Sequence, residues 1–195
     1  MSWLAPVTLQ GAKSALIPLS VEHLPGLQQA TGDGELWRLW YTAVPSPEGM
    51  AAEIERRLAL PTMCPFTVFD AGGRVVGMTT YMNTDALHKR VEIGSTWYAR
   101  SVQRSHVNTT AKLLMMGHAF DTLDCQVVGW RTDNYNFASQ RAIERLGARK
   151  DGVIRGHALR RDGTIRDTVM YSMRSGEWPE ARAQLLYLLQ RHAQD

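Results

Sequence analysis

The sequence has little cysteine and no long apolar run. Its two cysteines, Cys64 and Cys125, lie far apart, which favours two buried free thiols in a reducing compartment over a disulfide. No Cys-x-x-Cys pair or Cys/His cluster suggests a metal site, so we expect none. No stretch approaches the roughly 20 apolar residues that span a bilayer, and residues 1–19 lack the pattern of a signal peptide. We therefore expect a cytoplasmic protein without membrane contact.

A large excess of charge of one sign is also missing. The 195 residues include 22 Lys and Arg against 19 Asp and Glu, which gives a net charge of +3 and a pI near 9.0. This small excess fits an anionic ligand such as a nucleotide, and we do not expect nucleic-acid binding. The 44% hydrophobic residues can bury one core of ordinary size. No repeat or linker divides the chain, so we expect one domain, residues 1–195.

Hydrophobic periodicity predicts elements in the order β-α-α-β-β-β-α-β-α-β-β-α. The expected strands are Ala15–Leu19, Phe66–Phe69, Arg74–Met82, Lys89–Tyr98, Gln126–Thr132, Val153–Leu159 and Ile165–Met173. The expected helices are Ser20–Gln29, Ser46–Leu60, Asn108–Leu123, Asn136–Leu146 and Trp178–His192. Turns at residues 70–73 and 161–163 predict hairpins, which exclude a purely parallel sheet. We expect an α/β (α+β) fold with a mixed central sheet and helices on its faces.

A polar loop precedes the helix that we expect to begin near Asn108. The start of a helix presents unpaired N–H groups and a partial positive charge, which together can hold an anion. Arg104 and Lys112 add formal positive charge nearby. Taken alone, the loop also fits a purely structural interpretation, in which Asn108 or Thr109 caps the helix and Arg104 is solvated.

A second segment follows the next strand and runs into a helix. It contains Asn136-x-x-Ser139 and then Glu144-Arg145-Leu146-Gly147. Together the two segments resemble the GCN5-related N-acetyltransferase (GNAT) superfamily, specifically its RimJ/RimL-like branch of ribosomal-protein N-terminal acetyltransferases. The phosphate loop of that family follows the pattern Q/R-x-x-G-x-G/A, and Gln103–Asn108 occupies it. The N-terminal segments Leu9-x-Gly11 and Glu22-His23-Leu24 also match, so that the resemblance covers nearly the whole chain.

The resemblance implies transfer of an acetyl or related acyl group from acetyl-CoA (or another acyl-CoA) to a primary amine, by direct attack in a ternary complex. It also implies a largely antiparallel sheet of about seven strands that splays between strands four and five, which exposes a strand edge to the pantetheine arm. Arg141 or Arg145 would meet the adenosine phosphate, or else form a solvated helix face. The residues that the resemblance assigns to the cofactor are Thr96, Trp97, Tyr98, Gln103, Arg104, Ser105, His106, Val107, Asn108, Thr109, Thr110, Asn136 and Ser139.

Two positions depart from the family pattern, because His106 and Asn108 stand where small residues are expected. Glycine there would allow close approach of the backbone to phosphate and tolerate unusual dihedral angles. Asparagine tolerates the left-handed region and can cap a helix, so His106 is the stronger departure.

An amine must be neutral to attack the thioester carbonyl. At pH 7.4, deprotonation costs an α-amine about 0.5 kcal/mol and a lysine about 4 kcal/mol, so an α-amine substrate needs no strongly tuned base. Glu92 is the candidate proton acceptor, directly or through water; alternatively, it is a strand carboxylate that faces solvent or pairs with an arginine. Ser139 would donate a hydrogen bond to the leaving thiolate or only cap its helix and contact the cofactor. Tyr98 is a further candidate donor.

Other features leave alternatives open. The aromatic residues Trp37, Trp40 and Tyr41 either bind the acceptor or pack in the core, and His118 is interpreted as a core histidine. The acceptor is a protein N-terminus or a small amine, and the apolar last helix leaves a homodimer open. Two rival functions remain: a non-catalytic acyl-CoA-binding sensor and a protein-interaction module.

Overall fold

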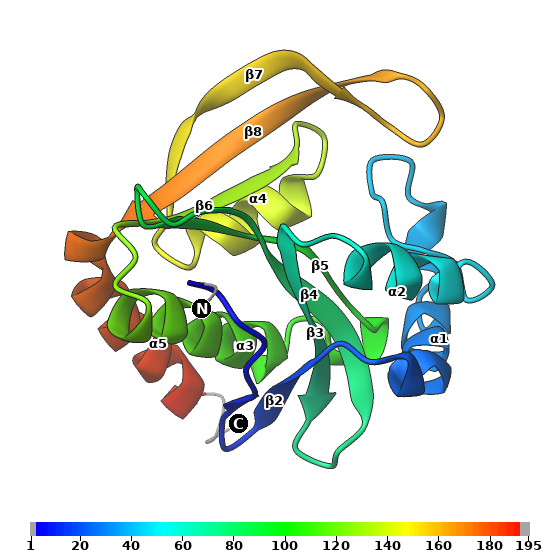
Figure 1. Ribbon diagram of the computed structural model, residues 1–195, viewed down its shortest axis with the longest axis horizontal. Helices are drawn as coiled ribbons and strands as arrows, with labels where there is room; N and C mark the ends of the chain where they lie inside the picture. The colour runs from blue at the N-terminus through cyan, green and yellow to red at the C-terminus, as the bar shows by residue number, and fades with distance from the viewer. Residues whose placement is uncertain (1–2, 192–195) are drawn as a thin grey trace.

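A computed structural model describes residues 3–191, and its centre is one eight-stranded sheet in the order β1-β2-β3-β4-β5-β6-β8-β7 (Figure 1). Among these strands, β5 and β6 form the parallel pair, and the other neighbours are antiparallel. The predicted mixed, largely antiparallel sheet is therefore confirmed. The strands are β1 (Leu9–Gln10), β2 (Ser14–Pro18), β3 (Met63–Asp70), β4 (Val75–Asp85), β5 (Arg90–Tyr98), β6 (Val127–Asp133), β7 (Arg149–Leu159) and β8 (Ile165–Arg174). Seven strands were expected from the sequence, and the additional strand is β1, which has two residues.

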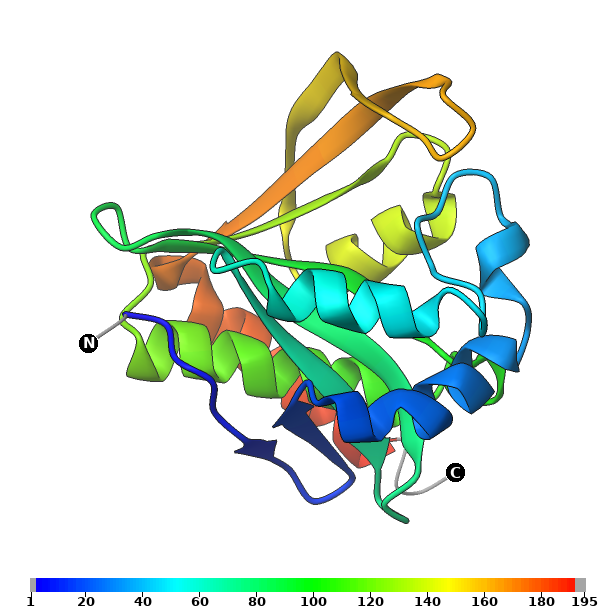
Figure 2. The same cartoon turned by 45° about the vertical axis from the view of Figure 1, so that its right-hand side comes forward.

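Helices cover both faces of the sheet, as predicted. Arg57 of α2 contacts Thr80, whereas Lys112 of α3 contacts Thr79, the preceding residue of β4. Because neighbouring side chains of a strand point to opposite faces, α2 and α3 lie on opposite sides of β4. Figures 1 and 2 show α1 and α2 together on one side of the molecule, and α5 packs against α3. The helices are α1 (Leu24–Gly32), α2 (Met50–Leu58), α3 (His106–Gly117), α4 (Phe137–Glu144) and α5 (Trp178–Arg191).

Hydrogen bonds at the helix starts correct two predicted boundaries. Ser105, and not Asn108, caps α3: its Oγ accepts from the Val107 N–H at 3.3 Å, so the helix begins two residues earlier than expected. Ser46 Oγ accepts from the Gly49 N–H at 3.2 Å, which closes a turn before α2 and delays that helix to Met50. Side-chain chemistry identified both regions as helix starts, but only the observed bonds fix the first residue.

The core fills the space between the sheet and its helices. Cys64 and Cys125 are both buried and free, as predicted. Leu185 of α5 is fully buried within this chain, whereas Leu186 is exposed, so the last helix packs on its own domain through one side. The predicted end of that helix, at residue 192, lies outside the described residues. No helix in residues 3–191 has the length and apolar character of a membrane span. The largest fully buried side chains are Leu16, Leu27, Met50, Ile54, Phe66, Met78, Tyr81, Ile93, Met115, Met116, Tyr171 and Met173.

Candidate active site

Strands β5 and β6 pair only briefly before they separate. Their register joins Arg90–Glu92 to Val127–Gly129. Beyond this point, β5 continues to Tyr98 along β4, while β6 continues along β8 (Figures 1 and 2). Within residues 3–191, the edge of β5 that faces β6 therefore has no strand partner from Ile93 onward. This is the splay that was predicted between the fourth and fifth expected strands.

A β-bulge shapes the open part of β5. The register passes from Thr80 opposite Gly94 to Met78 opposite Trp97, so that Ser95 and Thr96 share one partner position on β4. Ser95 has φ +48°, a left-handed conformation that few non-glycine residues adopt. Arg57 Nη1 donates to the Ser95 carbonyl oxygen at 3.3 Å, and its side chain is only 3% exposed. A buried guanidinium thus holds the bulge from the α2 face.

Lys112 holds the same bulge from the α3 face. Its Nζ donates to Thr79 Oγ1 at 3.1 Å and to Thr96 Oγ1 at 2.8 Å, and the residue is 5% exposed. Burial away from any carboxylate partner within the described residues lowers the pKa of Lys112 to about 7. The expectation that Lys112 adds charge near the polar loop is therefore wrong: its side chain points into the sheet, behind the start of α3.

The loop before α3 reaches its turn through one strained residue. Arg104 has φ +61°, whereas His106 and Asn108 lie in the first turn of α3 and have no positive φ. The backbone at His106 and Asn108 therefore does not require glycine, although the family has small residues at these two positions. Gln103 Nε2 donates to the Tyr98 carbonyl oxygen at 3.0 Å, which ties the loop to the end of β5.

The first turn of α3 presents backbone donors rather than side chains. The side chains of Val107, Thr109 and Thr110 are at least nine-tenths buried, so this turn can meet an anion only through the backbone N–H groups that precede the first intrahelical bonds. The Val107 N–H already bonds to Ser105 Oγ. Arg145 Nη2 donates to Thr109 Oγ1 at 3.0 Å, which places a guanidinium from the end of α4 beside this turn. The N–H groups of a helix start, the helix dipole and an adjacent arginine together fit a pyrophosphate.

Both helices that follow the parting strands begin at the open end of the splay. Because β5 and β6 are parallel, their carboxyl ends lie at the same side, and α3 and α4 start just beyond them. Asn136 caps α4 through its Oδ1, which accepts from the Ser139 N–H at 3.0 Å. The Ser139 side chain is half-buried at this start. The fold therefore brings the two predicted cofactor segments to one place.

The candidate proton acceptor lies at the last residue pair before the strands part. Glu92 is 5% exposed and accepts from Arg131 Nε at 2.7 Å and Arg131 Nη2 at 2.6 Å. Asn83 Nδ2 adds a third donor at 3.1 Å. The arginine pairing foreseen as the alternative for Glu92 is thus observed. A carboxylate offers about four acceptor positions, so one remains for a water.

Tyr98, the other candidate donor, lies in the core. The residue is 8% exposed, and within residues 3–191 its hydroxyl has no hydrogen-bond partner. Burial raises its pKa above the ordinary value for tyrosine. Trp97 beside it is also buried, so only the backbone of these two residues borders the open edge. His118 is half-buried, packs 6.3 Å from the Tyr81 ring and has a pKa lowered by burial, as a core histidine does.

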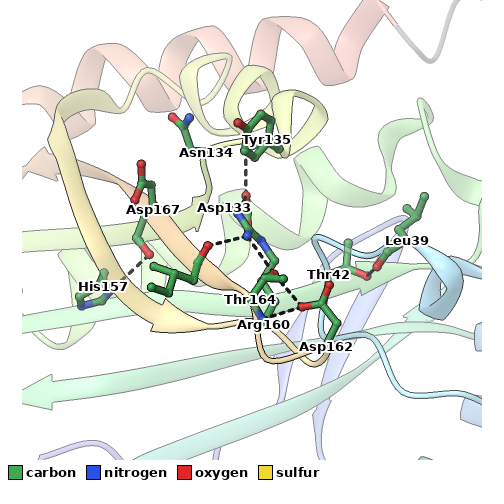
Figure 3. A network of polar contacts seen from close by, with 12 residues as sticks. Leu39, Thr42, Asp133, Asn134, Tyr135, His157, Arg160, Asp162, Thr164 and Asp167 are labelled. Carbon is green, nitrogen blue, oxygen red and sulfur yellow. Dashed lines mark hydrogen bonds and ion pairs between the residues drawn. The ribbon is translucent and has the colours of Figure 1, made fainter.

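A second polar cluster surrounds Asp133 (Figure 3). Asp133 lies four residues beyond Gly129, the partner of Glu92, so both carboxylates lie on the same face of the sheet. Asp133, at the end of β6, accepts from Arg160 Nε at 2.7 Å, and its side chain is 1% exposed. The Arg160 guanidinium lies 4.7 Å from the centre of the Trp40 ring and 5.8 Å from that of Tyr135. Arg161 donates to the carbonyl oxygens of Trp37 and Val44, which joins the β7–β8 hairpin to the α1–α2 loop.

Sequence reasoning did not identify this cluster. Trp40 is 49% exposed, so the aromatic segment borders the site rather than the core alone. Asp133 had one local signal, its position at the end of a buried strand. Arg160 lies 27 residues further on, and only the fold brings it to Asp133. Two other polar residues of the β7–β8 hairpin have local contacts: His157 Nδ1 lies 3.1 Å from Thr168 Oγ1, and Asp167 accepts from the Gly156 N–H.

Comparison with known families agrees with the geometry. Residues 15–149 match the model of the acetyltransferase (GNAT) domain, which is more than half of the chain. The chain belongs to this family of acetyltransferases. No curated protein matches it in a sequence search.

Solved structures extend the likeness over almost the whole chain. A GCN5-related N-acetyltransferase from Brucella melitensis has a TM-score of 0.86 at 27% identity, with 95% of this chain and 86% of that one covered. A protein from T. thermophilus is 33% identical, with a TM-score of 0.85 and coverage of 96% and 99%. Mycobacterium smegmatis RimJ, solved with a CoA disulfide, shares the fold at 19% identity, with a TM-score of 0.79 and coverage of 94% and 95%.

Proposed function

We propose that this chain is an N-acyltransferase that moves an acetyl group from acetyl-CoA to a primary amine by direct attack in a ternary complex. The observation that carries the proposal is the open edge of β5, because the helices α3 and α4 follow the carboxyl ends of the two parting strands and Arg145 joins them at the first turn of α3. An extended ligand with amide groups can pair with such an edge as an added strand. Its phosphate end would then reach the N–H groups of α3.

The residues take the following roles. Backbone groups of Thr96 to Tyr98 pair with the pantetheine arm, and the N–H groups from Arg104 to Thr109 hold the pyrophosphate with help from Arg145. His106 and Asn108 are half-exposed, so their side chains border the phosphates without blocking the helix start. Asn136 and Ser139 lie at the start of α4, on the side of the thioester.

The chemistry forms one bond and breaks one. The neutral amine attacks the thioester carbonyl, a C–N bond forms, and the C–S bond breaks with release of CoA. Glu92 receives the proton of the amine through a water at its remaining acceptor position. Ser139 donates a hydrogen bond to the leaving thiolate. Much of the acceleration comes from holding the thioester and the amine together, so an α-amine acceptor needs no stronger base.

Two measurements test this function in sequence. Isothermal titration with acetyl-CoA and with CoA tests binding, and thermal unfolding tests it independently, since ligand at 100 times its Kd adds about 2.7 kcal/mol of stability. CoA release is then followed with a panel of α-amines, lysine side chains, polyamines and aminoglycosides. Binding with turnover of at least one amine supports the proposal.

The rival functions predict different results. Binding of acetyl-CoA without turnover of any amine supports the non-catalytic sensor, which the replacement of two small loop residues by His106 and Asn108 makes worth testing. Absence of any stabilisation by CoA species contradicts both functions and leaves the interaction module.

A further inference from the structure

The charges beside the splay do not balance. Three arginines, Arg131, Arg160 and Arg166, lie on the face of β6 and β8 that also carries Glu92 and Asp133. Arg131 is two residues beyond the last β5–β6 pair, and Asp133 lies opposite Thr168, so that Arg166 continues the same face of β8 past the end of β6. These three guanidinium groups face two carboxylates, and Arg90, two residues before Glu92 on the same face of β5, adds a further cation beside Gly129, so that positive charge is in excess.

The two carboxylates are already committed. Glu92 is bound by two Arg131 nitrogens, and Asp133 accepts from Arg160 at 2.7 and 3.3 Å and from the Tyr135 N–H at 2.9 Å (Figure 3). Neither side chain is more than 7% exposed. Neither carboxylate is therefore free to bind the second ammonium group of a polyamine or an aminoglycoside. Asp151 of β7 also reaches this face, but it accepts from Ser172 Oγ at 2.7 Å, six residues along β8 from Arg166.

Arg166 is the cation beside Asp133 that has no carboxylate of its own. Within residues 3–191 it has no ion pair, and its Nε is buried without a hydrogen-bond partner. Burial lowers the pKa of Arg166, Asp133 opposes this, and Arg131 and Arg160 lower it further. An arginine keeps its charge at neutral pH, so a desolvated guanidinium next to two others attracts an anion strongly.

Two nearby acids do not supply the missing charge. Asp162 lies at the exposed hairpin tip, where its Oδ1 accepts from the N–H and hydroxyl of Thr164. Asp167 follows Arg166 in β8, so its side chain points to the other face, where its Oδ1 accepts from the Gly156 N–H at 2.8 Å.

We propose that Arg166 binds the anionic group of the acceptor, so that this enzyme prefers primary amines that carry a carboxylate or phosphate near the reacting nitrogen. The inference rests on the proposed acetyltransferase function and deepens it by naming the substrate class. It disfavours polyamines and aminoglycosides among the acceptors that a GNAT fold accommodates. The anionic group belongs either to an acidic N-terminal peptide or to a small amino acid or amino phosphate.

Matched pairs of acceptors test the preference at saturating acetyl-CoA. The peptide arm compares Ala-Glu-Glu-Gly with Ala-Gln-Gln-Gly and Ala-Lys-Lys-Gly. The small-molecule arm compares β-alanine with β-alaninamide, and phosphoethanolamine with ethanolamine. In at least one arm we expect kcat/KM for the acidic member to exceed that of its neutral partner by about tenfold or more, which is the usual value of one charge-assisted bond. The arm that shows the larger ratio identifies the source of the anion.

Variants assign the preference to one residue. Arg166→Gln should bring the acidic and neutral members within about threefold, mainly through KM of the acidic one, and Arg166→Lys should restore part of the ratio. Arg174→Gln is the matched control, since this exposed arginine lies at the other end of β8 and forms only a long surface ion pair with Glu177. It should keep the wild-type ratio. All variants should retain the wild-type KM for acetyl-CoA and the thermal midpoint.

Two results overturn the inference, and they are distinguishable from failure of the function. Turnover of neutral or polycationic amines as fast as acidic ones contradicts it while the acetyltransferase function stands. An acidic preference that survives Arg166→Gln likewise shows that this residue does not bind the anion. Absence of both acetyl-CoA binding and turnover overturns the proposed function itself, and the inference with it.

Discussion

The buried ammonium of Lys112 makes the stability of this protein depend on pH, and one substitution measures the effect. Lys112→Met replaces the ammonium group by an apolar chain of similar length. Thr79 Oγ1 and Thr96 Oγ1 lie 2.7 Å apart, so these two hydroxyls keep a hydrogen bond to each other when Nζ is removed. The variant thus removes a buried titratable group without leaving its partners unsatisfied.

The magnitude follows from the pKa in the two states. Burial lowers the pKa of Lys112 from 10.5 to about 7 in the folded protein. Between these two values the unfolded chain binds a proton that the folded chain has released, so folding stability rises with pH in this interval. With 1.36 kcal/mol for each pKa unit, wild type should gain about 2 kcal/mol over the Met variant between pH 7 and pH 9.

Urea unfolding at pH 6, 7, 8 and 9 measures this difference. The difference between the two proteins cancels the contributions of other titrating groups, including the buried cysteines. Lys150→Met, which removes an exposed ammonium from β7, is the control for the loss of one charge. If the difference between wild type and Lys112→Met stays constant from pH 6 to pH 9, Lys112 keeps its proton on folding and the reasoning from burial is refuted.

Three other substitutions, two of them with a matched control variant, test the site and its support. Glu92→Gln keeps the size of the side chain, and we expect kcat to fall about 100-fold while the KM for acetyl-CoA stays unchanged. Gly77→Ala places a methyl group 2.2 Å from a backbone carbonyl oxygen of β5, so we expect urea unfolding to show a loss of more than about 3 kcal/mol. Gly32→Ala, with nothing within 4 Å, should leave stability unchanged or higher. Arg145→Gln should raise the KM for acetyl-CoA about fivefold, whereas Arg141→Gln should not.

Each expectation has an opposite outcome. Unchanged kcat in Glu92→Gln shows that water alone takes the proton and that the carboxylate serves only to bind Arg131. Equal stability of the two glycine variants contradicts the close approach of β4 and β5. A normal KM in Arg145→Gln removes the guanidinium from the phosphate site.

The sequence predicts the elements of this fold better than their first residues. Apolar periodicity identifies α3, but both Ser105 and Asn108 are good caps. Only the bond from the Val107 N–H to Ser105 Oγ decides between them. The strand signal was likewise sufficient for β5, yet the bulge at Ser95 depends on its partner strand and on Arg57, which lies 38 residues earlier.

Buried charge is the feature that sequence reasoning missed most. Lys112 occupies a helix turn near a polar loop, where lysine is normally solvated. Its partners Thr79 and Thr96 belong to β4 and β5, and no local sequence pattern predicts their contact with Lys112. The pairs of Arg131 with Glu92 and Arg160 with Asp133 are also formed between segments far apart in the chain. Of these, only an arginine partner for Glu92 was foreseen.

The parting of β5 and β6 also bears on the size of the acyl group. The backbone ladder ends at Glu92 and Gly129, and two residues later the Arg131 side chain crosses back to Glu92. The bidentate pair of Arg131 with Glu92 therefore joins the two strands at the point where the splay begins. We expect this pair to resist a wider separation of the strands for a longer acyl chain. We therefore expect chain-length selectivity to change through substitutions of the side chains between the two strands, and not through the angle at which the strands part.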